Sequence, residues 1–221
     1  MNIATFSIVG RSKDGKQIGV AVASRFLAVG AYVPSATLSG AIASQAWTNM
    51  QLHVYGQSLL KENKTPKEIL ESFFADDDKA EVRQAGIVDA SGLAATYTGK
   101  DCQPWAGGKA EKHERGSYAV QGNILKGPEV IDDMADAWLN SDTESHLSCR
   151  FMDVLKAGQS AGGDTRGKQG AALYIIEKDK GFNGTSDVVV DLRVDDSENP
   201  IEELSRLLQL HSKIFDIGEV E

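Results

Sequence analysis

The first side chain in the sequence that could act as a nucleophile is Thr5, in the opening stretch MNIATFSIVG. The residues that follow it are typical of a β-strand, so Thr5 stands where that strand is expected to begin. A threonine hydroxyl attacks an amide when a base takes its proton. A free α-amine on the same residue, with a pKa of about 8, suits that task at neutral pH. Residues 1–4 precede Thr5, so this chemistry requires scission between Ala4 and Thr5.

A glycine-rich segment, GGDTRGKQG at residues 162–170, gathers the charged side chains of Asp164, Arg166 and Lys168. Glycines let backbone N–H groups approach a ligand, and a guanidinium binds a carboxylate through two parallel hydrogen bonds. The segment is therefore a candidate for binding a substrate or ligand. The alternative is a solvated loop between a helix and a strand, in which a glycine ends the helix.

The segment SQAWTN, residues 44–49, places amide groups at the end of an expected strand. Gln45 or Asn49 could donate a hydrogen bond to an oxyanion that forms during amide cleavage. The alternative gives the segment a structural role, with Trp47 anchored in the core and Thr48 or Asn49 capping the following helix.

The segment YAVQGN, residues 118–123, offers two further amides, Gln121 and Asn123, on either side of a glycine. Both are candidates for contacts with a substrate or an oxyanion. A sharp strand end explains an asparagine beside a glycine equally well.

The segments that must position these side chains are strands and helices in alternating blocks. Strands are expected at residues 4–9, 18–24, 39–45, 82–90, 93–99, 117–125, 170–178 and 186–196. Helices are expected at residues 50–63, 65–74, 127–141, 145–159 and 200–215. Residues 100–116 are polar and glycine-rich, so they are expected to form a long irregular loop.

Hairpin-joined strands in blocks, with helices in antiparallel pairs, argue against a doubly wound parallel sheet. They indicate an α+β fold, a four-layer α/β/β/α sandwich of two antiparallel sheets covered by helices. No low-complexity linker divides the chain, so residues 1–221 are expected to form a single domain.

The helix expected at residues 65–74 has the clearest start signal in the chain. Thr65 stands at the cap position, Pro66 at the first helical position and Glu68 at the third. This pattern predicts a capping box, in which the threonine and glutamate side chains each bond to the backbone of the other residue.

The composition is that of an ordinary globular protein and narrows the function classes. Of the 221 residues, 41% are hydrophobic and 25% are charged, and the net charge is -9 with a pI near 5.0. The chain therefore lacks the basic footprint of a nucleic-acid-binding protein, and its apolar runs are too short to cross a membrane. Its two cysteines and four histidines show no metal-ligand spacing, so no metal or other cofactor is expected. The N-terminus does not read as a secretory leader, so a cytoplasmic location is expected.

A series of motifs runs in order from Thr5 to about His211: TFSIVG, GVAVASRFLAVG, SQAWTN, RQAGIVDA, CQPWAGG, YAVQGN, GPEV, AGGDTRGKQGAAL and VDLRVDD. Together they resemble the domain-of-unknown-function 1028 family. That family is grouped with the N-terminal nucleophile (Ntn) hydrolases, which include proteasome β-subunits, penicillin acylases and glycosylasparaginases. The resemblance implies the same sandwich that the element order indicates. It also implies a reaction class, but no substrate.

Within that resemblance, Thr5 takes the position of the catalytic nucleophile. Ser24 and Arg25 match the last two residues of the Asp-Ser-Arg step that follows the second strand of proteasome β-subunits. Ala23 stands where the aspartate would be, and residues 31–46 contain no lysine to match the one on the third proteasome strand.

Asp164 matches an aspartate that precedes a Ser-Gly-Gly sequence in proteasomes, although here the corresponding serine is replaced in Gln169-Gly170-Ala171. The scaffold is therefore expected without the proteasome's charge relay. Any catalysis must then use a different set of supporting groups.

Three hypotheses follow. The first is an amidohydrolase of Ntn type, active on a small amide, peptide or amino-acid derivative after removal of residues 1–4. The second is a non-catalytic protein that binds or senses a small ligand on the same scaffold. The third keeps an enzyme but moves the nucleophile to Ser24 or Cys102, with His113 as the base for Cys102. Each is compatible with a homo-oligomer, because such sandwiches often associate.

Overall fold

The computed structural model describes residues 5–215, which form strands and helices in the expected order. The strands are β1 (Thr5–Arg11), β2 (Gln17–Ser24), β3 (Pro34–Thr37), β4 (Gly40–Ala46), β5 (Arg83–Asp89), β6 (Ala94–Thr98), β7 (Gly107–Glu111), β8 (Ser117–Asn123), β9 (Gly170–Glu177) and β10 (Val188–Val194). The α-helices are α1 (Gln51–Lys61), α2 (Pro66–Ala75), α3 (Glu129–Asn140), α4 (Leu147–Ser160) and α5 (Pro200–Phe215). Short 3₁₀ turns η1, η2 and η3 span Val29–Ala31, Ala80–Val82 and Phe182–Gly184.

The strands form two antiparallel sheets, which confirms the expected α+β class. The six-stranded sheet has the order β10-β9-β2-β1-β8-β7, and the four-stranded sheet has the order β3-β4-β5-β6. Strand β1 therefore lies in the middle of the larger sheet, between β2 and β8.

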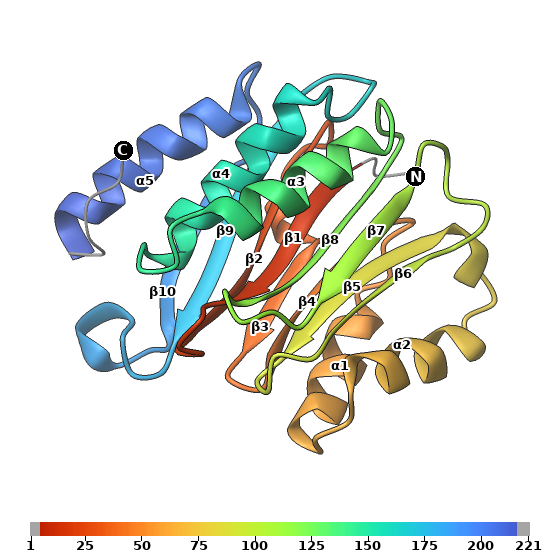
Figure 1. Ribbon diagram of the computed structural model, residues 1–221, viewed down its shortest axis with the longest axis horizontal. Helices are drawn as coiled ribbons and strands as arrows, with labels where there is room; N and C mark the ends of the chain where they lie inside the picture. Colours follow the sequence, from red (N-terminus) through yellow and green to blue (C-terminus); the bar gives the residue numbers. More distant parts are fainter. Residues whose placement is uncertain (1–4, 216–221) are drawn as a thin grey trace.

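Helices cover the outer face of each sheet. Helices α3, α4 and α5 pack on the six-stranded sheet, and α1 and α2 pack on the four-stranded sheet (Figure 1). One buried apolar cluster, around Trp138 and Phe151, lies between the larger sheet and its helices. A second, which contains Val9 and Val88, fills the space between the two sheets. A third, around Leu52, lies beneath α1 and α2.

Two short strands were not expected from the sequence. The prediction that residues 100–116 are wholly irregular is wrong, because β7 (Gly107–Glu111) pairs with β8. Its residues Gly-Gly-Lys-Ala-Glu have low strand propensity and are largely exposed, so the neighbouring strand, and not local preference, makes them extended. Strand β3 (Pro34–Thr37) is a four-residue edge strand that begins with a proline, which donates no hydrogen bond to a sheet.

The predicted capping box at the start of α2 is confirmed. The Thr65 side chain accepts a hydrogen bond from the backbone N–H of Glu68, and the Glu68 carboxylate accepts from the backbone N–H of Thr65 at 2.8 Å. This exchange satisfies two groups at the helix terminus that have no partner within the helix.

The alternation of side chains along β1 determines which of them face the other sheet. Ile8 lies in the cluster beneath the helices, whereas Val9 lies in the cluster between the sheets. Because the side-chain period of a strand is two, Thr5, Ser7 and Arg11 share the inter-sheet side with Val9. The middle strand of the large sheet thus presents hydroxyl groups at one end of the inter-sheet layer and a guanidinium at the other.

Two largely buried histidines make the stability of the fold depend on pH. Burial lowers the pKa of His53, on α1, to about 4, although a hydrogen bond to the backbone of Val33 acts in the opposite direction. Burial, with a smaller effect from His211, also lowers the pKa of His146 to about 4. In the unfolded chain a histidine has a pKa of about 6.5, so the unfolded chain binds more protons than the folded one between these two pH values.

We therefore expect the free energy of unfolding to fall as the pH decreases from about 6.5 to about 4. Urea unfolding at several pH values across this window would measure the slope. A His53→Gln variant, neutral throughout, is expected to show a shallower fall than the wild type over the same range. Identical pH profiles for the two proteins would contradict this assignment.

Candidate functional site

The inter-sheet layer changes character along its length, and its polar end is the candidate functional site. One end is filled by the apolar cluster that contains Val9. The other end holds buried hydroxyl and amide side chains from both sheets. These are Thr5, Ser7, Ser24, Gln45, Gln84, Gln121 and Asn123. Burial of so many polar groups requires that they bond to one another or to a ligand.

Thr5 lies at this polar end, where three neighbouring strands have their ends side by side. In the sheet register Thr5 stands opposite Ser24 of β2 on one side and opposite Asn123 of β8 on the other. Its hydroxyl donates to Ser24 Oγ at 3.2 Å, and its exposed fraction is 0%. The nucleophile expected from the sequence is thus enclosed in the described structure, with a second hydroxyl beside it.

A directed chain of hydrogen bonds connects the two sheets. Gln121 Nε2 donates to Ser7 Oγ at 2.6 Å, and Ser7 Oγ donates to Gln45 Oε1 at 2.7 Å. Gln45 Nε2 then donates to Gln84 Oε1 at 2.8 Å. Gln45 and Gln121, which the sequence analysis selected from separate segments, are therefore brought together.

Gln84, on β5, forms hydrogen bonds with several residues of this network. It was not among the candidate residues predicted from the sequence. Its Oε1 accepts from both Gln45 Nε2 and Asn123 Nδ2, the latter at 3.0 Å. Its Nε2 donates to the carbonyl of Gly122 at 2.7 Å and to Thr98 Oγ1 at 3.0 Å. A signal was present in RQAGIVDA, because Gln84 shares a strand face with the buried Val88.

Gly86, two residues further along β5, leaves the space that the Gln121 amide occupies. A Cβ built at Gly86 would lie 2.0 Å from Gln121 Oε1, which is closer than any side chain tolerates. Gln121 Oε1 itself is buried and has no hydrogen-bond partner in the described structure. The glycine is therefore required for the close approach of this amide to the backbone.

The glycine-rich turn lies at the Thr5 end of the larger sheet. Asp164, buried at 5% exposure, accepts from the backbone N–H of Arg25, the residue after Ser24, at 2.9 Å. Its backbone forms a bridge with Leu125, just beyond the end of β8. The turn thus joins the strands on both sides of β1 at the Thr5 end.

Within the turn, the guanidinium of Arg166 is directed to Asp164. Arg166 Nη2 lies 3.0 Å from Asp164 Oδ2, and Arg166 Nε lies 3.2 Å from Oδ1. The Arg25 guanidinium donates to the carbonyl of Arg166. These contacts hold the turn rigid, and the bidentate contact that was expected for a ligand is made in this structure to Asp164.

Two other selected residues lie elsewhere. Lys168 Nζ is 4.0 Å from Glu202 Oε1 on α5, an outward-facing contact. Asn49 belongs to a separate cluster, since its Nδ2 donates to Asp77 Oδ2 at 3.1 Å and its Oδ1 accepts from the backbone N–H of Gln51. The Asn49 side chain therefore bonds to the backbone of the first residue of α1, a structural contact, although the cap residue of this helix is Met50.

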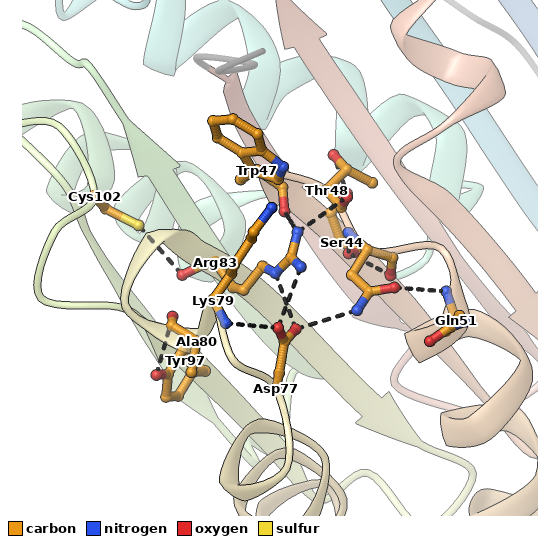
Figure 2. Close-up of polar contacts among 11 residues, drawn as sticks. Ser44, Trp47, Thr48, Gln51, Asp77, Lys79, Ala80, Arg83, Tyr97 and Cys102 are labelled. Carbon is orange, nitrogen blue, oxygen red and sulfur yellow. Dashed lines mark hydrogen bonds and ion pairs between the residues drawn. The ribbon is translucent and has the colours of Figure 1, made fainter.

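Asn49 bonds to a cluster whose centre is a buried ion pair between Arg83 and Asp77, shown in Figure 2. Arg83 Nε lies 2.9 Å from Asp77 Oδ2, and Arg83 Nη2 lies 3.2 Å from Oδ1. Arg83 Nη1 also donates to the carbonyls of Trp47 and Thr48. The pair thus fastens the segment after β4 to the segment before β5.

Burial raises the pKa of Asp77, but hydrogen bonds from Arg83, from the backbone N–H of Lys79 and from Asn49 outweigh it, so the net pKa is lowered. The carboxylate is therefore charged at neutral pH and supports the ion pair. Trp47 is 39% exposed, so the expectation that it anchors the core is wrong.

Cys102 also belongs to this cluster. Its thiol donates to the carbonyl of Arg83 at 3.2 Å, and burial raises its pKa to about 11. A thiol with such a pKa is protonated at neutral pH and is a poor nucleophile. His113, considered as its base, accepts instead from the backbone N–H of Arg115. The contacts of both side chains are structural.

Left-handed backbone conformations follow two of the network residues. Ala46, directly after Gln45, has φ 62°, and Ile124, directly after Asn123, has φ 53°. A β-branched residue rarely adopts this conformation, and such strain persists where the surroundings impose it. Both strained residues lie at the polar end of the inter-sheet layer, where β4 and β8 end and the following loops begin.

Within residues 5–215, no three His, Cys, Asp or Glu side chains are grouped so that they could hold a metal ion. Over the same range, no helix is long and apolar enough to span a bilayer.

Replacement of Gln84 by leucine tests the network. Leucine would remove the acceptor that Gln45 Nε2 and Asn123 Nδ2 share and the donor to Gly122, and the loss in unfolding free energy is expected to be about 3 kcal/mol or more. Chemical denaturation measures this. Gln103→Leu, at an exposed position, serves as the matched control and should change stability by no more than about 0.5 kcal/mol. Equal losses in the two variants would contradict the role of Gln84.

Known proteins resemble this chain over nearly its full length. The family model described as "Family of unknown function (DUF1028)" matches residues 5–204. The crystal structure of protein SPO2555 from Silicibacter pomeroyi, described with the same family, is 26% identical, has a TM-score of 0.83 and matches over 95% of this chain and 89% of that chain. None of the curated proteins matches this chain significantly. The chain therefore belongs to the DUF1028 family, whose function is unknown.

Proposed function

We propose that the protein is an amidohydrolase of the N-terminal nucleophile type, with Thr5 as the catalytic residue after removal of residues 1–4. The two sheets and their covering helices then represent the four-layer α/β/β/α sandwich of that superfamily. The substrate is a small amide, a peptide or an amino-acid derivative.

The position of the Thr5 hydroxyl supports this proposal most directly. Thr5 begins β1, in the middle of the larger sheet, and its side chain is directed into the inter-sheet layer. Its Oγ1 lies 3.2 Å from a second hydroxyl oxygen, Ser24 Oγ. The apolar filling of the layer gives way to amide groups at this end. Buried polar groups around a potential nucleophile form a preorganised environment for charge that develops during a reaction.

The reaction begins when Thr5 Oγ1 attacks the carbonyl carbon of the substrate, and the hydroxyl proton passes to the free α-amine of Thr5. The carbon–nitrogen bond of the substrate then breaks, and the departing amine takes that proton. This leaves an ester on Thr5 Oγ1. Water attacks the ester, the α-amine accepts a proton from it, and the acid product leaves with Thr5 restored.

The side chains beside Thr5 have distinct roles in this scheme. Ser24 accepts the Thr5 hydroxyl hydrogen and so orients Oγ1 for attack. Asn123 flanks Thr5 in the sheet, and Gln45 Nε2 lies 3.5 Å from the Thr5 carbonyl, so these amides are the nearest donors for an oxyanion. Asp164 acts as a positioning residue, because it holds the backbone directly after Ser24.

The non-catalytic alternative draws on a different observation. The Thr5 side chain is fully enclosed, and the amides at this end are engaged with one another. Such a network could instead discriminate a ligand that enters between the loops. The two proposed functions can be distinguished by experiment, because only the enzyme requires a free α-amine on Thr5.

Mass spectrometry of the purified protein together with an amidase assay tests the proposal. We expect a species that begins at Thr5, and release of amine from a panel of aminoacyl and N-acyl amides. Thr5→Ala should reduce turnover by about 10³-fold or more, and Thr5→Ser should retain part of it.

Thr185→Ala, in an exposed turn, is the matched control and should keep full activity. A chain that remains uncut under all conditions would overturn the proposal. Full activity in the Thr5→Ala variant would overturn it as well. Ligand binding that survives Thr5→Ala without any turnover in the wild type would support the non-catalytic alternative.

A further inference from the structure

The opposite end of the inter-sheet layer carries an unpaired arginine. Arg11 ends β1 on the same side as Thr5, and six residue steps of about 3.3 Å separate the two by about 20 Å. Among residues 5–215, Arg11 makes no ion pair and no side-chain hydrogen bond, and its Nε is sealed from solvent. A partly desolvated guanidinium without a counter-charge is unfavourable, so the site favours an anion.

Turns from both sheets surround this guanidinium. A Cβ built on Gly15, in the β1–β2 turn, would lie 1.9 Å from Arg11 Nη2, so the guanidinium packs directly against that turn. Gly92, in the β5–β6 turn of the other sheet, lies close to Arg11 Nη1, with a built Cβ at 3.8 Å. The Arg11 guanidinium thereby packs between turns of the two sheets.

A cavity of about 410 Å³ opens beside Arg11, within the range of small-molecule sites. Its basic lining consists of Arg11, Lys16, Lys178 and Lys180. Lys16 is paired with Asp14 at 3.0 Å, whereas Lys178 and Lys180 form no ion pair in the described structure. Such a concentration of positive charge is unusual in a chain whose net charge is -9.

The acidic lining is a single side chain, Glu177, whose Oε2 accepts from Gln17 Nε2 at 2.8 Å. The carboxylate is therefore directed to Gln17 and does not pair with Arg11. The apolar lining includes Ile18 and Leu38, and Leu38 is 43% exposed although it is a large hydrophobic residue. The cavity thus combines a charged rim with an apolar wall.

We propose that this cavity is a binding site for a small organic carboxylate with an aliphatic chain. The carboxylate would bind the Arg11 guanidinium through two parallel hydrogen bonds, with Lys178 and Lys180 adding attraction. The aliphatic chain would cover Ile18 and Leu38. The site is separate from Thr5 and does not depend on the proposed hydrolase activity.

Isothermal titration of the intact chain with sodium hexanoate tests this site, with hexanol and inorganic phosphate as matched probes. Hexanol keeps the chain without the charge, and phosphate keeps the charge without the chain. We expect saturable binding of hexanoate, and at least about tenfold weaker binding of both other probes. If hexanol binds as tightly as hexanoate, the proposed contact between the carboxylate and Arg11 is contradicted. If phosphate binds as tightly as hexanoate, the proposed preference for an organic carboxylate is contradicted.

Variants locate the binding. Arg11→Met keeps an unbranched apolar side chain without the guanidinium and should weaken hexanoate binding by at least about tenfold. The double variant Lys178→Gln/Lys180→Gln, in an exposed hairpin loop, should also weaken it, and this variant answers the question if Arg11→Met does not fold. Lys100→Gln, at an exposed position that follows β6 at the opposite end of the layer, should bind as the wild type does. Unchanged affinity in the folded Arg11 or lysine variants, or no saturable binding at all, would overturn the proposal.

Discussion

The architecture depends on how the polar groups between the two sheets satisfy one another. Two stacked sheets normally exclude water from the space between them, so any amide placed there must find a hydrogen-bond partner within that space. Gln84 meets this condition for five groups at once, because its carbonyl accepts two amides and its amide reaches Gly107, Gly122 and Thr98. Since these partners belong to both sheets, the network also determines how the sheets sit relative to each other, and through β1 it places Thr5.

Two charged contacts outside the layer hold the loops that surround this end. The Asp164 turn joins the ends of β2 and β8, and the Arg83–Asp77 pair joins the segments before β5 and after β4. Each carboxylate accepts several hydrogen bonds as well as a guanidinium, which is the condition under which a buried ion pair is retained without a large penalty. The loops at the Thr5 end are consequently built to be rigid, as a preorganised site requires.

Much of the fold was predictable because local signals and tertiary packing agree. The capping box at Thr65, the hairpin between β1 and β2 and the apolar stripes of the helices all depend on neighbours along the chain. β7 was missed because its Gly-Gly-Lys-Ala-Glu segment becomes a strand only through pairing with β8. Trp47 was misplaced because a tryptophan after a strand usually enters the core, whereas here the left-handed Ala46 precedes it and it remains 39% exposed.

The sequence by itself determined the α+β class, the order of the elements, the family and the position of Thr5 at the start of a strand, because periodicity, turn residues and ordered motifs are properties of the linear chain. It also pointed to Gln45, Gln121, Asn123 and Asp164 as polar residues at element ends. Only the tertiary structure decided that these four gather near one threonine while Asn49 and Lys168 do not, and that Gln84 is the common partner of Gln45 and Asn123. The reason is that the contacts within and between the two sheets join residues about 40 to 140 positions apart, and no local pattern encodes which inward-facing amide meets which.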